Sequence, residues 1–435
     1  MSLPRHLIVT LCLVVLGLTG CSKGGNNSSG NSGQIRVVNA FFEATSLDYV
    51  VAGTTLAAAL PFQGIRPYQS VNNGVQTFTV TVTGAATPLV NASSSINGGA
   101  QYTYVVFGPL TSVATIFAVD SFTDPGSGFF SIRVMNTAAG IGPIDVYLTP
   151  PGADLTVAAP TVAAVAYGAT SSFVAVNTGA TFEIRITPTG TKTVIYDSAP
   201  KTFAEHSGTT IMAYSKGSGT LVNVALLNSD SAGTSSIADN LVAQYKVVNA
   251  SLVSSPLNVF IDGNLQLSNV PFLGVSNYQQ TTAGTHAITV QAQSTPGSTL
   301  LTLNPNLSSA TDTSIALVGP SGGMAGVVLL DDNQPPATGS AGVRFVNTSA
   351  NVASVDVFVN FSKQVTGLAN GTASSYVNLT ATALTGTSYE FDFNVSGTVN
   401  AVLKLPGVVL LPTHKYTVYL AGPTATVQGI VTQDN

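Results

Sequence analysis

Apolar and polar positions alternate with a period of two along many short segments of the chain. Residues 144–148 (IDVYL), 257–261 (LNVFI) and 355–359 (VDVFV) each place three aliphatic side chains on alternate positions. The intervening positions carry a short polar residue and an aromatic one. In a β-strand this pattern puts the aliphatic side chains on one face and the polar and aromatic ones on the other. The pattern therefore predicts strands with one buried face.

A second pattern repeats at intervals of about 100 residues. An apolar run contains a basic residue, and an asparagine three positions after that residue ends the run. Nine residues after the asparagine comes an Asp or Asn. Fixed offsets in four copies indicate an internal repeat. The copies are Arg36, Asn39 and Asp48; Arg133, Asn136 and Asp145; Lys246, Asn249 and Asn258; and Arg344, Asn347 and Asp356.

Later landmarks agree with four copies. Gly-Pro pairs close a late strand in three of them, and Gly/Pro/Ser-rich joints separate the copies. We therefore predict an all-β protein with four tandem immunoglobulin-like antiparallel β-sandwich modules. The predicted modules are residues 34–124, 129–233, 239–334 and 340–435.

The composition supports this fold and excludes one class of partner. Hydrophobic residues make up 45% of the chain and charged residues only 8%, while 42 Gly and 22 Pro supply turns. The net charge is −5 and the sequence contains no Lys/Arg run. Without a basic patch, nucleic acid is not expected as a partner.

The N-terminus predicts a lipid anchor. An apolar stretch at residues 7–18 is too short to span a bilayer but suits a signal peptide, which we place at residues 1–20. It ends in Leu-Thr-Gly-Cys, which resembles the lipobox of bacterial lipoproteins. The resemblance implies acylation of Cys21, a flexible tether at residues 21–33 and, from Ser22, sorting to the outer membrane. The alternative is an ordinary secreted protein with a chance cysteine.

The repeat itself resembles a known family. The runs "VVNAS" and "LNVFIDG" of the third copy, and "FVNTS" and "VDVFVN" of the fourth, are similar to the bacterial domain of unknown function numbered 4397. That domain occurs in tandem in secreted and lipid-anchored proteins. The resemblance covers nearly all of residues 34–435 and implies no established activity.

The three motif positions suggest a structural role. The asparagine amide can bond nearby backbone and begin a turn. The basic residue and the acid nine residues after the asparagine lie on the two arms of that turn, and we expect them to pair across neighbouring strands. Where the basic residue is Lys246, the partner position is the neutral Asn258.

The sequence offers candidates for two kinds of ligand site. Tyr147, Phe260 and Phe358 follow the motif acid by two residues and are candidates for an aromatic face that stacks sugars; the alternative is that neighbouring chain covers them. Acidic residues gather at the module ends, where Asp331 and Asp332 form a weak calcium candidate. The alternative is that these acids are solvated charges that limit edge pairing.

Evidence for catalysis is slight. Residues 319–323 satisfy G-x-S-x-G around Ser321, but a strand follows where that motif needs a helix. His206, His286 and His414 fall in three different modules. No catalytic residue, metal site or cofactor is therefore assigned.

We predict a non-enzymatic, lipid-anchored cell-envelope protein whose modules act as a binding, adhesion or structural scaffold. Its expected partners are the membrane, through the anchor, and a surface glycan or another envelope protein. The alternative is a hydrolase or metal-dependent enzyme on the same scaffold. The ligand, the oligomeric state and the face of the outer membrane stay open.

Overall fold

The computed structural model describes residues 30–215, 221–320, 322–383 and 385–434. The predicted signal peptide, Cys21 and Ser321 lie outside these residues. The regular elements described are β-strands, joined by two short 3₁₀ helices. Within the described residues, no helix has the length and apolar character needed to cross a membrane. The predicted all-β class is confirmed.

Unit 1 is a sandwich of two four-stranded sheets. Its inner sheet has the order β4-β1-β7-β8 and its outer sheet the order β3-β2-β5-β6. The first strand pairs antiparallel with β4 but parallel with β7. The elements are β1 (Ser32–Ala40), β2 (Ser46–Val51), β3 (Thr54–Pro61), β4 (Ile65–Asn72), β5 (Gly74–Val82), β6 (Pro88–Ile96), β7 (Gln101–Phe107), η1 (Leu110–Ser112) and β8 (Ala114–Val119).

Unit 2 repeats this plan with one more strand. The inner sheet is β12-β9-β15-β16-β17 and the outer sheet is β11-β10-β13-β14, and β9 pairs parallel with β15. The strands are β9 (Phe129–Thr137), β10 (Ile144–Thr149), β11 (Val162–Val165), β12 (Val174–Asn177), β13 (Glu183–Pro188), β14 (Tyr196–Asp197), β15 (Gly208–Ser215), β16 (Val222–Asn228) and β17 (Ser235–Ala238).

Unit 3 has the inner sheet β21-β18-β26-β27 and the outer sheet β20-β19-β23-β24. A two-stranded ladder of β22 and β25 adds to it. The strands are β18 (Val242–Ser251), β19 (Leu257–Ile261), β20 (Asn264–Val270), β21 (Gln279–Thr282), β22 (Gly284–Thr285), β23 (Ile288–Ala292), β24 (Thr299–Leu303), β25 (Asn306–Leu307), β26 (Asp312–Gly319) and β27 (Ala325–Asp331).

Unit 4 has the inner sheet β31-β28-β34-β35 and the outer sheet β30-β29-β32-β33. As in the other units, the first strand pairs parallel with the first strand of a late hairpin, here β34, which is followed by β35. The elements are β28 (Ser340–Ser349), β29 (Ser354–Val359), β30 (Ser362–Ala369), β31 (Val377–Thr380), β32 (Thr387–Val395), β33 (Ala401–Leu410), β34 (Lys415–Gly422), η2 (Thr424–Thr426) and β35 (Gln428–Gln433).

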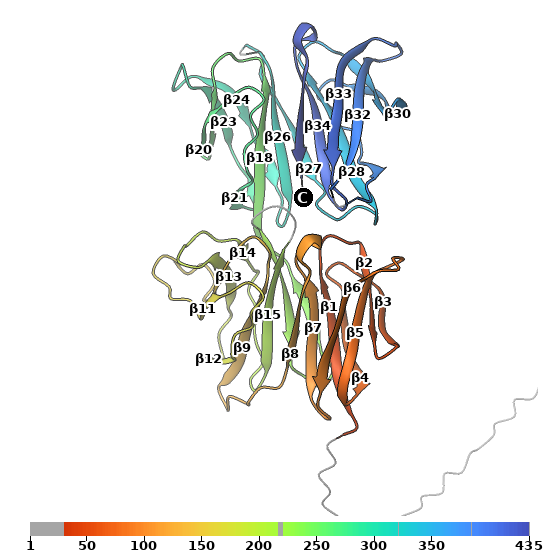
Figure 1. Ribbon diagram of the computed structural model, residues 1–435. Helices are drawn as coiled ribbons and strands as arrows, with labels where there is room; N and C mark the ends of the chain where they lie inside the picture. The colour runs from red at the N-terminus through yellow and green to blue at the C-terminus, as the bar shows by residue number, and fades with distance from the viewer. Residues whose placement is uncertain (1–29, 216–220, 321, 384, 435) are drawn as a thin grey trace, which may run out of the picture.

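The four units associate in two pairs through their inner sheets. Units 1 and 2 form a first block, and units 3 and 4 form a second block; Figure 1 shows the first block in the lower half and the second in the upper half. Between units 1 and 2, Val38 and Phe107 share an apolar cluster with Met135, Met212 and Tyr214. Between units 3 and 4, a similar cluster is formed by Val248, Ala250, Ala316, Val346, Tyr419, Ala421 and Ile430.

This pairing explains why the first strand of each unit is buried along most of its length, on both faces. All ten residues of β18 and of β28 are buried. Alternate residues of β18, such as Tyr245 and Val247, enter the core of unit 3, while Val248 and Ala250 face unit 4. Strands covered on both faces lose the polar alternation that a half-exposed strand shows. The strands of the outer sheets keep it, as in the alternating burial of β19.

Candidate functional site

The asparagine of the motif ties the first strand of each unit to its outer sheet. Asn39 Oδ1 accepts a hydrogen bond from Phe41 N at 3.0 Å, and Asn39 Nδ2 donates to Leu60 O at 2.9 Å. Because the amide satisfies backbone groups on both sides of the turn, it fixes the path from inner to outer sheet. Asn136, Asn249 and Asn347 make the same two kinds of bond.

The motif acid holds a β-bulge in the neighbouring edge strand. Asp48 Oδ1 accepts from Ala59 N at 2.6 Å, at the point where β3 places two residues opposite one residue of β2. Ala59 has a φ of 47°, in the left-handed region that favours glycine. The same geometry recurs in units 2, 3 and 4, with left-handed bulge residues Ala164, Asn269 and Gly367 bonded to Asp145, Asn258 and Asp356.

The expected pairing between the motif cation and the motif acid is wrong. The cations pair with a different set of acids, which follow the last strand of a unit or end it: Asp120, Asp331 and Asp434. These acids are buried, so their interpretation as solvated charges is also wrong. The cause is the inner-sheet pairing, which encloses the cations and the acids between two units. The motif acids remain on the outer sheets.

In the second block the cluster holds two cations and two acids. Asp331 accepts from Arg344 Nη2 of unit 4 at 2.6 Å, and Asp434 accepts from Lys246 Nζ of unit 3 at 2.7 Å. Each acid is thus bonded by the cation of the other unit. Tyr278 and Tyr376 donate their hydroxyls to Asp331 and Asp434 at 2.6 and 2.8 Å.

Aromatic rings cover the cations of both blocks. The ring of Tyr376 lies 4.9 Å from the Arg344 guanidinium carbon, and that of Tyr278 lies 4.8 Å from Lys246 Nζ. In the first block, Tyr68 and Phe173 cover the two arginines at 4.9 and 4.8 Å. Cation–π contacts of this kind strengthen when the cation is removed from solvent, and these cations are buried.

The first block has the same cluster with one acid fewer. Asp120 accepts from Arg133 at 2.6 Å and from Arg36 at 3.2 Å. The acid occupies an equivalent position in units 1, 3 and 4. A Thr or Ser pairs with the cation on the neighbouring strand, a residue of the following strand pairs with that Thr or Ser, and the acid comes two positions after that residue. In unit 2 the equivalent position is Ser229. Arg36 Nη1 donates instead to Asn228 O, at 2.9 Å. Two cations therefore share one carboxylate.

The pKa shifts of the two guanidinium groups reflect this difference. Burial is the largest influence on both Arg133 and Arg344, and it disfavours their charged forms. In the first block burial prevails, and the pKa of Arg133 is lowered. In the second block Tyr376, Asp331 and Asp434 outweigh burial, and the pKa of Arg344 is raised. The first cluster is therefore the less well compensated of the two.

The predicted aromatic face is not shared by the three candidate residues. Tyr147 is 1% exposed, because Lys192 Nζ lies 4.6 Å from its ring centre and bonds Ala158 O in the covering loop. This corrects its assignment to an open face. Phe260 and Phe358 are half-buried on the outer sheets. Lys363 lies over Phe358 at 5.4 Å, whereas Phe260 pairs across the strands with Leu265.

The two calcium candidates are engaged by cations. Asp331 accepts from Arg344, Tyr278 and Ser314, and Asp332 pairs with Lys415. A calcium ion would have to displace both cations, so the arrangement of these two acids does not favour a calcium site. In the part of the chain that the structure describes, no group of three His, Cys, Asp or Glu residues could hold a metal ion.

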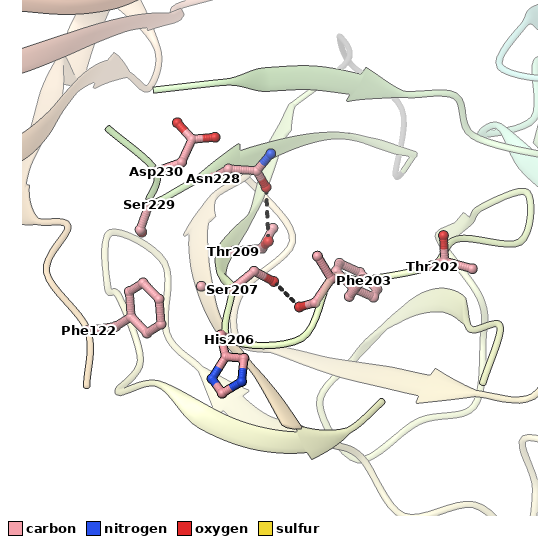
Figure 2. Close-up of a pocket in the computed structure, with 11 residues that line it drawn as sticks. Phe122, Thr202, Phe203, His206, Ser207, Thr209, Asn228, Ser229 and Asp230 are labelled. Carbon is pink, nitrogen blue, oxygen red and sulfur yellow. Dashed lines mark hydrogen bonds between the residues drawn. The ribbon is translucent and has the colours of Figure 1, made fainter. Parts of the chain in front are cut away.

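A cavity of about 490 Å³ lies where the linker between units 1 and 2 meets the end of unit 2. Figure 2 shows Phe122 on one side of the turn that carries His206, and Phe203 on the other. A methyl group at position 208 would lie 2.6 Å from the Phe122 ring, so glycine allows the ring to rest on the backbone. The lining is completed by Thr202, Ala204, Ser207, Thr209, Asn228, Ser229 and Asp230.

The rim of the cavity carries a His–Asp pair. His206 Nδ1 lies 2.8 Å from Asp124 Oδ1, and this bond is the main cause of the raised pKa of His206. His206 Nε2 lies 3.7 Å from Glu205 Oε1. The adjacent Ser207 directs its hydroxyl to Ala204 O and not to the imidazole. The arrangement thus lacks the Ser-to-His bond that nucleophilic catalysis requires.

The sequence patterns did not point to this cavity. Phe122 and Phe203 lie in loops, and Ser229 differs from its counterparts only when the units are aligned through their sheet registers. The Ser229 Oγ is buried and has no hydrogen-bond partner among the described residues. The signal that would have pointed to the site is the missing acid at the end of the second repeat.

Comparisons with known proteins place the chain by family. A search of curated proteins finds no match. Several solved structures resemble it weakly, and three of them serve as examples. The first is the CBM26 module CBMbc of Eubacterium rectale Amy13K in complex with maltoheptaose, with 12% identity over 42% of this chain and 93% of that chain and a TM-score of 0.15. The second is the Bacillus anthracis TIE protein, with 8% identity over 87% of this chain and 68% of that chain and a TM-score of 0.16. The third is a product complex of the multi-modular glycogen-degrading pneumococcal virulence factor SpuA, with 12% identity over 86% of this chain and 37% of that chain and a TM-score of 0.17.

At these TM-scores the likenesses carry no argument about function. The family comparison is firm, because the model of the domain of unknown function DUF4397 matches residues 33–147, 243–357 and 341–435. The first two matches each run through one unit into the second strand of the next, and so include both cations of a block. These segments cover more than half of the chain, which therefore belongs to the DUF4397 family.

Proposed function

We propose that this protein is a non-enzymatic scaffold of the bacterial cell envelope, lipid-anchored at Cys21, whose paired units display binding surfaces. Two sets of observations support the proposal. The sequence supplies the anchor motif and the tether, and the structure shows how the repeat motif is used.

The observation that carries the proposal is the burial of all four motif cations between units. Arg36 is fully buried, and Arg133, Lys246 and Arg344 are at most 5% exposed. A substrate or ligand could not reach these groups without separating the units. Removing one member of such a buried pair costs about 3–5 kcal/mol, so the clusters strongly favour the assembled block. The repeat motif therefore builds architecture.

Two preassembled blocks suit a display role. Each block leaves its outer sheets facing away from the joining surface, where the half-buried Phe260 lies among strands with exposed polar residues. The proposed partners are a surface glycan or another envelope protein. Repeated units gain from multivalency when each contact is weak, which favours binding over catalysis.

The anchor is tested by labelling cells that express the full chain with an alkyne fatty acid and separating their membranes. We expect label and membrane association in the wild type and loss of both in Cys21→Ser. The control is Cys12→Ser, whose position lies inside the predicted signal peptide, and it should retain both. Unlabelled wild-type protein in the soluble fraction would overturn the proposed anchor. Protease treatment of intact cells then reports which side of the outer membrane the blocks face.

A further inference from the structure

We infer that the cavity between the inter-unit linker and unit 2 is a binding site for an uncharged sugar unit. This inference deepens the proposed function by naming a ligand class and a site. The cavity, at about 490 Å³, falls within the size range of small-molecule sites, about 300–1,000 Å³. It also lies at a junction between units, where such sites are common.

The lining combines the two chemistries that a sugar requires. Phe122 and Phe203 are half-buried rings that offer apolar surface to the C–H face of a pyranose. Both rings are held in place: Phe122 by Gly208 and by Phe173 at 5.6 Å, and Phe203 by stacking on Phe130 at 4.6 Å. A preorganised ring loses little entropy when a ligand stacks on it.

Polar groups surround these rings. Thr209 and Asn228 are joined at 3.0 Å on the cavity wall, and Ser207 and His206 line the rim. Ser229 contributes an Oγ that is buried and unpartnered among the described residues. A buried hydroxyl without a partner is costly, and a ligand hydroxyl that reached it would remove that cost. Hydroxyl, amide and imidazole groups together suit a polyol.

The charges favour a neutral ligand over an anion. Among the nearby basic groups, Arg36 and Arg133 are buried and already bonded to Asp120 and to backbone carbonyls, and the imidazole of His206 is bonded to Asp124. The groups at the cavity surface include Asp230, and Asp124 and Glu205 flank His206. Carboxylates in these positions repel a phosphate or an acidic sugar.

Comparison of the blocks points to the same place. The position of Ser229 is occupied in unit 4 by Asp434, whose carboxylate accepts from Lys246, Thr417 and Tyr376. With serine at 229, unit 2 lacks both the negative charge and the carboxylate that accepts these three hydrogen bonds in unit 4. The cavity wall of unit 2 is left with a small polar side chain, where unit 4 has a saturated ion pair.

The test is calorimetric titration of the full chain, in a detergent without a sugar headgroup, with glucose, galactose, mannose, N-acetylglucosamine, maltose and cellobiose. We expect saturable binding of at least one neutral sugar with a Kd of about 1 mM or tighter. Phe122→Ala should weaken it at least about tenfold, while Phe361→Ala, an exposed ring in unit 4, should leave it unchanged.

A second variant separates loss of the site from loss of the fold. Ser229→Asp fills the cavity wall with a charged side chain that Arg36 can bond, so it should abolish sugar binding while raising the melting temperature of the first block. Absence of binding by all six sugars overturns the inference, as does binding that survives both Phe122→Ala and Ser229→Asp. Tighter binding of glucuronate than of glucose also overturns it. None of these results depends on acylation at Cys21.

Discussion

Tyr376 donates its hydroxyl hydrogen bond to Asp434 at 2.8 Å, between units 3 and 4. At the corresponding positions between units 1 and 2, the chain has Phe173 and Ser229. The acid and the hydroxyl that bonds it are therefore present together or absent together. A buried tyrosine hydroxyl without an acceptor costs about 1–3 kcal/mol, so phenylalanine is the better residue once the acid is gone.

The first prediction restores the missing pair. Ser229→Asp should stabilise the first block, because its carboxylate would meet Arg36 Nη1, which now bonds the carbonyl of Asn228. Phe173→Tyr alone should destabilise the block by about 1–3 kcal/mol, because its hydroxyl lacks an acceptor. In the double variant the two changes should couple favourably by at least about 1 kcal/mol.

Urea unfolding followed by circular dichroism measures this cycle, since the chain has no tryptophan to report by fluorescence. The reciprocal cycle, Asp434→Ser with Tyr376→Phe in the second block, is the matched control and should show coupling of the same sign. Strictly additive effects in both blocks would show that the tyrosine and the acid do not act together.

The second prediction assigns each buried acid to one block. Asp120→Ala should lower the stability of the first block by about 3–5 kcal/mol, because Arg36 and Arg133 would remain buried without their carboxylate. Asp434→Ala should do the same to the second block. Differential scanning calorimetry should show two transitions, with each variant moving only one of them.

Asp154→Asn is the control for that experiment. Asp154 is exposed, and its Oδ1 accepts from Thr156 N, a bond that asparagine keeps. It should move neither transition. If a single transition were seen, shifted alike by Asp120→Ala and Asp434→Ala, the four units would unfold as one body and the two-block description would have to be abandoned.

The sequence predicted the class of fold well, because the alternation in 257–261 and the four asparagines are local signals. The partner predicted for the cations was wrong because only local signals can be read from the sequence, and the true partners are distant along the chain. Arg36 lies 84 residues before Asp120, and Lys246 lies 188 residues before Asp434, beyond loops of differing length. Only the pairing of inner sheets brings them together. The apolar residues on both faces of β18, Tyr245 and Val247 on one and Val248 and Ala250 on the other, were the available sign that this strand is covered on both faces.

The third prediction concerns the rim of the cavity. The bond to Asp124 is the main cause of the raised pKa of His206, and Glu205 also faces the imidazole. A histidine whose folded pKa is raised contributes stability that is fully present below its unfolded pKa of about 6.5. That contribution is lost as the pH rises through the higher, folded value. The rim should therefore loosen above pH 6.5.

NMR titration of the imidazole signals checks this directly, and only four histidines have to be assigned. The pKa of His206 should lie above 6.5 in the wild type and return towards 6.5 in Asp124→Asn. Proteolytic cleavage within residues 121–128 should increase as the pH rises above 6.5. In His206→Asn, a residue that tolerates the left-handed φ of 62°, cleavage should lose this pH dependence.

The last prediction tests the bulge that the motif acid holds. Ala59 and Gly367 occupy equivalent left-handed positions, with φ of 47° and 65°, and donate their N–H groups to Asp48 and Asp356. The left-handed conformation destabilises a non-glycine residue by about 1–2 kcal/mol. Glycine avoids this strain, but it loses about 0.5–1 kcal/mol more chain entropy on folding, which offsets part of the gain. Ala59→Gly should therefore stabilise unit 1 by about 0.5–1 kcal/mol.

Gly367→Ala should destabilise unit 4 by a similar amount, because the added methyl group has room and only the backbone is strained. The control is Ala58→Gly, one residue away in the same bulge but without a positive φ, which should destabilise unit 1 through chain entropy alone. Opposite signs at neighbouring alanines would show that the strain lies at the left-handed residue whose N–H the motif acid accepts. Equal signs at Ala58 and Ala59 would mean that the bulge carries no strain for the acid to hold.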